Sequence, residues 1–157
     1  MLKLFNAYRQ LPFYFKIIIA LSLMLFVMSL TQPAFYIDRK EDPNAYSDSL
    51  VLFLLGWMSL LGGAIVPFIL WLANPLYIVS ILLILRKKIG ALCTTWSSTI
   101  LALIFWQLKS IMTSESGGGY SHITGRGPGF YLWLASFVVL ALGVSLYQCL
   151  INRNKEV

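Results

Sequence analysis

The feature that most constrains this chain is a run of 37 residues without a charged side chain, between Asp48 and Arg86. A helix crosses the hydrocarbon core of a bilayer with about 20 apolar residues. The run is therefore too long for one straight span and too short for two spans joined by a polar turn. It predicts a membrane-embedded chain in which one membrane element is irregular.

The composition also favours a bilayer environment. Hydrophobic residues make up 59% of the 157 residues and charged residues only 11%, whereas soluble domains carry about 25% charged residues. We expect one transmembrane domain over residues 1–157. The first apolar stretch, residues 13–30, is longer than the ~7–15 apolar residues of a signal peptide, so it is interpreted as a retained span.

The apolar regions predict an all-α fold, an integral membrane bundle of four transmembrane helices with a bent or broken second element. Glycines and prolines between positions 62 and 75 mark the break, because proline cannot donate a hydrogen bond to the preceding turn. An outer-leaflet segment, residues 50–62, precedes the second span. It is interfacial, re-entrant or part of a long tilted helix, and the sequence leaves these alternatives open. The expected spans are residues 13–30, 65–85, 89–111 and 130–151.

The basic residues predict that both termini are cytoplasmic, since Lys and Arg in short loops favour the cytoplasmic side. Dividing the uncharged run into two spans would place residues 86–88, all basic, outside. With four spans, the inside holds Lys3, Arg9, Lys16, Arg86, Lys87, Lys88, Arg153 and Lys155, and the outside holds Arg39, Lys40, Lys109 and Arg126.

Two groups of polar residues fall inside the expected spans. Asn74 lies beside Pro75 near the middle of the bilayer, where an amide either contacts a ligand or ion, or makes a packing hydrogen bond at the kink. Packing is the favoured interpretation. In the third span, hydroxyl side chains recur at helical spacing, so they either line a wet path between several copies or pack helices closely. Packing is again favoured. These residues are Thr94, Thr95, Ser98 and Thr99.

The outer loops hold the remaining candidates, His122 and Arg126. The glycine-rich stretch around Arg126 is a possible anion-binding nest. One His and two Cys are too few for a four-ligand structural zinc site, and no metal or cofactor is expected. No acidic residue lies within an expected span, which argues against a proton-coupled pump. The net charge of +6 is interpreted as a topology signal, and no nucleic-acid partner is expected.

Two segments carry a resemblance to a protein family. The stretch LGWMSLLGGAIVPFILWLANPL (residues 55–76), followed by GPGFYLWLAS (residues 127–136), resembles uncharacterised small bacterial membrane proteins. The resemblance covers about a third of the chain. It implies four helices in a bacterial inner membrane, and it carries no assigned activity.

These observations predict a small non-enzymatic inner-membrane protein that acts as a homo-oligomer or as an accessory subunit of a membrane complex. Its expected partners are membrane lipids and either its own copies or another membrane protein. Two alternatives remain open. One is an oligomeric pore or channel, in which the hydroxyl face of the third span would line the path. The other is a membrane-bound immunity or stress-response protein.

Overall fold

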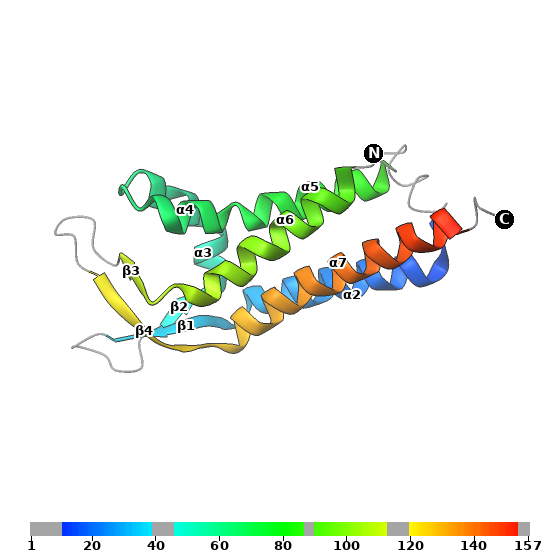
Figure 1. Cartoon of the computed structure of the whole chain (residues 1–157). Helices are drawn as coiled ribbons and strands as arrows, with labels where there is room; N and C mark the ends of the chain where they lie inside the picture. Colours follow the sequence, from blue (N-terminus) through cyan, green and yellow to red (C-terminus); the bar gives the residue numbers. More distant parts are fainter. Residues whose placement is uncertain (1–10, 39–45, 87–89, 113–119, 154–157) are drawn as a thin grey trace.

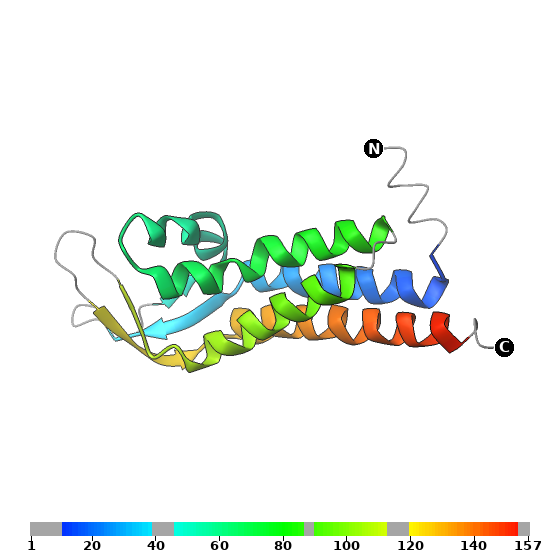
Figure 2. The same ribbon diagram turned by 45° about the horizontal axis from the view of Figure 1, so that its top comes forward.

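The computed structural model describes residues 11–38, 46–86, 90–112 and 120–153. Two pairs of helices form a bundle: α2 (Phe13–Leu30) lies beside α7 (Pro128–Arg153), and α5 (Ala73–Leu85) lies beside α6 (Gly90–Ile104). A small sheet closes one end of this bundle, and a short helical hairpin projects next to it (Figure 1). The first turn of α2 and the last turn of α7 lie together at the opposite end (Figures 1 and 2).

Helix α2 has no glycine or proline between its ends, and it begins directly after Pro12. Its buried face advances by three or four residues at a time, which is the repeat of one helix face; it consists of Phe15, Ile19, Ser22, Phe26 and Ser29. This face packs on α7 and α5, where Phe26 stacks on Tyr77 with ring centroids 5.0 Å apart. The opposite face of α2 exposes large apolar side chains, as a helix in contact with lipid does.

The uncharged run forms the projecting hairpin and then α5. Helix α3 (Ser49–Leu55), the 3₁₀ helix η1 (Gly56–Leu60) and α4 (Ile65–Trp71) make up residues 49–71, which we call the apolar hairpin. Asp48 begins it by accepting a hydrogen bond from the Leu50 amide at 2.8 Å, as N-cap residues do. Gly63 reverses the chain with a φ of 75°, a conformation open to glycine at low cost.

The expected break in the second element lies at Leu72, between α4 and α5. Together these two helices give an apolar stretch, Ile65–Leu85, of 21 residues. Two further helical stretches in the described part of the chain are long and apolar enough to cross a membrane, Phe13–Leu30 and Pro128–Leu150. By length and composition, these three stretches are compatible with a multi-pass membrane protein.

The prediction of an all-α fold is wrong at one end of the molecule. Four antiparallel strands form a sheet in the order β2-β1-β4-β3, where the sequence predicts only polar loops. Strands of three to seven residues alternate too briefly to be distinguished from loops. Their pairing is also distant in sequence, because Phe35 lies opposite Arg126. The strands are β1 (Pro33–Ile37), β2 (Tyr46–Asp48), β3 (Ser110–Met112) and β4 (Tyr120–Arg126).

The predicted third span, residues 89–111, is also corrected. Helix α6 ends at Ile104 and is followed by the 3₁₀ helix η2 (Phe105–Gln107) and then by β3. Residues 105–111 read FWQLKSI and contain no glycine or proline, so the sequence holds no strong helix stop signal there. The helix ends because the following backbone pairs with β4, which supplies hydrogen bonds that the helix would otherwise provide.

Candidate functional site

An apolar cavity of about 450 Å³ lies between the apolar hairpin and the sheet end of the bundle. One wall comes from the hairpin, including Leu52 and Trp71, and another from η2, β1 and the start of α7, including Phe35 and Phe105. Ligand pockets in proteins typically measure about 300–1,000 Å³ and are mostly apolar. This cavity is therefore the candidate site, and none of the described residues that line it is charged.

The serines of the cavity wall are already hydrogen-bonded within the protein. Ser29 donates to the Phe26 carbonyl, Ser49 to the Gln32 carbonyl and Ser59 to the Gly56 carbonyl, each at 2.6 Å. A hydroxyl that donates to a carbonyl of its own helix needs no further partner. Because their hydroxyl protons are bonded to the protein, these serines leave the cavity wall largely apolar.

Asn74 forms the inner end of the cavity and joins three structural elements. Its Nδ2 donates to the Trp71 carbonyl at 3.2 Å, and its Oδ1 accepts the indole N–H of Trp133 at 2.8 Å. Pro75 has no N–H to donate to the Trp71 carbonyl, so the Asn74 amide takes over that acceptor. The structure thus places Asn74 and Pro75 in a packing contact at the helix break.

Trp71 fixes the hairpin over the cavity. Its indole N–H donates to the Phe53 carbonyl at 2.9 Å, which ties α4 to α3. Its ring lies directly against Gly56, where any added Cβ would collide with it. A buried indole needs such a partner for its N–H. No sequence signal marks Trp71 or Trp133 as cavity residues, because an apolar run does not distinguish a cavity wall from ordinary packing.

The hydroxyl residues of the third span lie inside the bundle. Thr95 donates to the Ala91 carbonyl at 2.5 Å, and Thr99 donates to the Thr95 carbonyl at 2.8 Å. Ser98 likewise bonds back to its own helix, and all three side chains are buried. Thr94 bonds back to the Gly90 carbonyl and also accepts a hydrogen bond from Ser80 on α5. The structure therefore gives these side chains packing contacts within one chain.

A second polar contact inside the bundle was not anticipated. The Ser22 hydroxyl is 2.7 Å from the Tyr77 hydroxyl and also donates to the Ser136 carbonyl at 2.8 Å. These residues come from α2, α5 and α7, so the contact joins three helices. Sequence spacing could not reveal it, since the three positions lie more than fifty residues apart along the chain.

Arg126 lies on β4 and caps the 3₁₀ helix η2, which follows α6. Its Nη2 donates to the carbonyls of Trp106 and Leu108 at 3.1 and 2.5 Å, and its guanidinium lies over the rings of Phe105 and Phe130. A helix end leaves carbonyls unpaired, and a cation near them is stabilising. Burial lowers the pKa of Arg126 from its ordinary value, and nearby Tyr131 offsets part of that effect.

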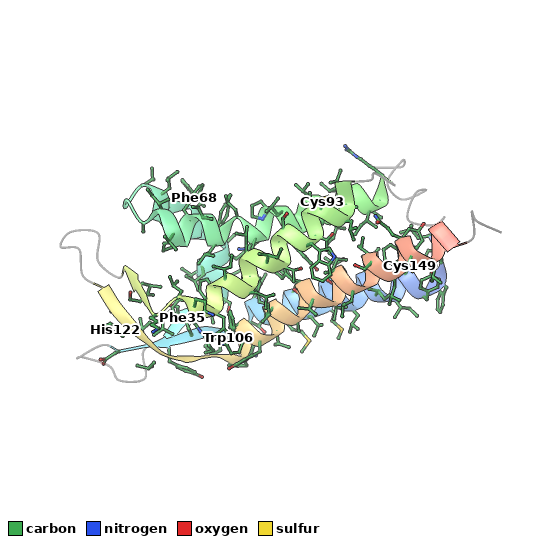
Figure 3. The ribbon with its side chains drawn as sticks, in the orientation of Figure 1. Phe35, Phe68, Cys93, Trp106, His122 and Cys149 are labelled. Carbon is green, nitrogen blue, oxygen red and sulfur yellow. The ribbon has the colours of Figure 1, made fainter. Side chains whose placement is uncertain are left out.

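His122 lies on β4, exposed, at the sheet end of the molecule (Figure 3). Its carbonyl accepts the Asp38 amide at 2.9 Å, which extends the sheet. Cys93 and Cys149 are free thiols at the other end of the bundle (Figure 3). Within the described residues, no three His, Cys, Asp or Glu side chains are grouped so that they could hold a metal ion.

No family model, curated protein or solved structure matches this chain.

Proposed function

We propose that this chain is a non-enzymatic protein of a bacterial inner membrane, which spans it four times with both termini in the cytoplasm. In this proposal it works as a homo-oligomer or as an accessory subunit of a membrane complex, through contacts of the apolar hairpin with protein inside the bilayer. The irregular backbone of that hairpin is the observation that carries the proposal.

Four spans require α6 to cross the membrane together with η2. Fifteen α-helical residues rise about 22 Å, and the three residues of η2 add about 6 Å at 3₁₀ pitch. Their sum is close to the ~30 Å of the hydrocarbon core. The short α6 therefore supports a fourth span if η2 is included.

The orientation is supported by the described charges. Of the described basic residues, Lys16, Arg86 and Arg153 lie at the bundle end away from the sheet, and Lys109 and Arg126 lie at the sheet end together with the acidic Asp38 and Asp48. Basic residues favour the cytoplasmic side, so the sheet is placed outside. Several basic residues used for the prediction lie outside the described residues: Lys3, Arg9, Arg39, Lys40, Lys87, Lys88 and Lys155.

The apolar hairpin supports a protein partner because of its backbone. It contains a 3₁₀ helix and a non-helical turn at residues 61–64. Its outward side chains are nevertheless large and apolar, with Leu61 73% exposed. Irregular backbone at membrane depth is tolerated where protein shields it or where it lines a water-filled cavity. An apolar outer face does not suit a water-filled cavity, so we assign its cover to protein.

The pore alternative receives no support from the hydroxyl face of the third span. Thr95, Ser98 and Thr99 are buried within a single chain and bonded to its own carbonyls. A path between copies would need them on an outer face.

The proposal is tested by crosslinking in native membranes, followed by affinity capture and mass spectrometry. The wild-type chain is expected to be recovered with a second copy or with one recurrent membrane protein. Leu61→Ala with Ile65→Ala, on the hairpin, should lose that product. Leu142→Ala with Leu146→Ala removes similar exposed apolar area from α7 and should keep it. Recovery of wild type as a lone chain would contradict the proposal.

A further inference from the structure

Every polar side chain in the wall of the cavity beneath the apolar hairpin already makes a hydrogen bond within the protein. Its serines donate to backbone carbonyls, both of its indole N–H groups are bonded, and the Asn74 amide is bonded through both its nitrogen and its oxygen. A polar ligand would find few unused partners to replace its water, which is costly. An apolar ligand gives up no hydrogen bond there.

The position of the cavity along the bundle suits a long apolar chain. Its lining includes Asn74, near the middle of the apolar stretch Ile65–Leu85. It also includes Phe35 and Ile111, in the sheet. Half of the hydrocarbon core is about 15 Å deep, so a cavity lined from the middle of that stretch to the sheet lies among the acyl chains of one leaflet.

The cavity is also open at the edge of the hairpin, so that an apolar chain can enter it. Val51 and Leu55 line it and are themselves 50% and 52% exposed on the hairpin surface. Water does not fill a purely apolar cavity readily, and an empty one forfeits packing contacts for all the side chains around it. Acyl chains are the apolar molecules present at that depth.

We propose that this cavity binds one acyl chain of a membrane phospholipid from the leaflet nearest the sheet, with the apolar hairpin as its cover. The gain on binding comes from filling a preformed space, because lipid tails are as apolar as the cavity wall. The proposal goes beyond the hairpin's contact with a partner, since it concerns the inner face of the hairpin and holds for the chain alone.

The test uses the full chain in phospholipid nanodiscs that contain a phosphatidylglycerol with a photoreactive diazirine on one acyl chain. After irradiation, labelled peptides are mapped by mass spectrometry. The label is expected at one chain per protein, on the hairpin and on the peptide that contains Phe130. Labelling that follows surface exposure, as strong on the lipid-facing Met24 of α2 as in the cavity, would overturn the proposal.

Two tryptophan variants on α3 compare a substitution inside the cavity with one on the exposed face of the same helix. Leu52 lines the cavity, whereas Leu54 is 55% exposed and does not line it. Leu52→Trp should lower cavity labelling about tenfold, which corresponds to about 1.4 kcal/mol of binding free energy. Leu54→Trp should leave the labelling unchanged. Equal labelling in both variants would overturn the proposal.

A second variant in the cavity keeps the test valid even if the Leu52→Trp protein does not fold. Met58 lines the cavity at its open side, so Met58→Trp narrows it without disturbing the buried core, and it should reduce labelling in the same way. A mixture of isotopically light and heavy protein distinguishes crosslinks within one chain from crosslinks to a second copy, which is the alternative occupant of the cavity. A crosslink from a cavity residue to a second copy, in place of the lipid label, would show that protein fills the cavity and would overturn the proposal.

Discussion

Trp133 donates its indole N–H to the side-chain oxygen of Asn74 at 2.8 Å, and this bond connects α7 to the break between α4 and α5. Asn74 uses its other end to satisfy the Trp71 carbonyl, which Pro75 cannot reach. One amide therefore closes the helix break, holds it against the bundle and forms the inner end of the cavity.

Asn74→Leu should destabilise the fold by about 1–3 kcal/mol, because it leaves the partly buried indole N–H of Trp133 and the Trp71 carbonyl without these partners. Trp133→Phe removes the donor together with part of the ring, and it leaves only one hydrogen-bonding atom, Asn74 Oδ1, without this partner. The unfolding midpoint in detergent, compared across both single variants and the double variant, measures their coupling. Strictly additive losses would contradict the contact.

Gly127→Ala should destabilise the junction between the sheet and α7. A Cβ at this position would overlap the carbonyl oxygen of Pro33, which belongs to backbone and cannot move aside easily. Overpacking of this kind costs about 1–3 kcal/mol. Gly125→Ala, two residues earlier and within β4, is the matched control. Its Cβ would lie 3.6 Å from the Tyr36 ring, an ordinary contact. Similar unfolding midpoints for the two variants would refute the close approach.

Gly143→Ala should separate α2 from α7, because the new Cβ would meet the stiff, branched side chain of Ile18. A loss of about 1–3 kcal/mol in unfolding free energy is expected. Ile18→Ala in the same chain should recover part of that loss by making room. No recovery in the double variant would mean that the two helices do not pack through this pair.

Arg126→Gln should loosen η2 more than the rest of the bundle. The variant loses the positive charge and the Nη2 donor that holds the carbonyls of Trp106 and Leu108. Hydrogen exchange is expected to quicken in residues 105–111 and to stay unchanged in α2. Uniform protection in wild type and variant would show that Arg126 does not cap this helix.

The proposed orientation predicts which side of the membrane reaches each end of the bundle. In a background without the native cysteines, Arg86→Cys should react with a membrane-impermeant maleimide only in inverted vesicles. Asp38→Cys, at the sheet end, should react only in intact spheroplasts. The reverse pattern would contradict cytoplasmic termini.

The sequence was sufficient where a single local signal decides the structure. The apolar stretch at 13–30 is α2, and Pro75 next to Asn74 marks a helix break that lies one turn or less away, at Leu72. The sheet could not be foreseen, because pairing of Phe35 with Arg126 depends on where the helices bring the two loops. The cavity could not be foreseen either, since its wall combines residues from α2, the hairpin, η2 and α7.

The most direct test of the central claim is site-specific photocrosslinking in native membranes, with the photoreactive residue at Leu61 of the hairpin or at Leu146 of α7. Both side chains are exposed and apolar, at 73% and 58%. The account predicts a protein adduct from position 61 and lipid adducts alone from position 146. Lipid adducts alone from both positions would contradict a hairpin covered by protein.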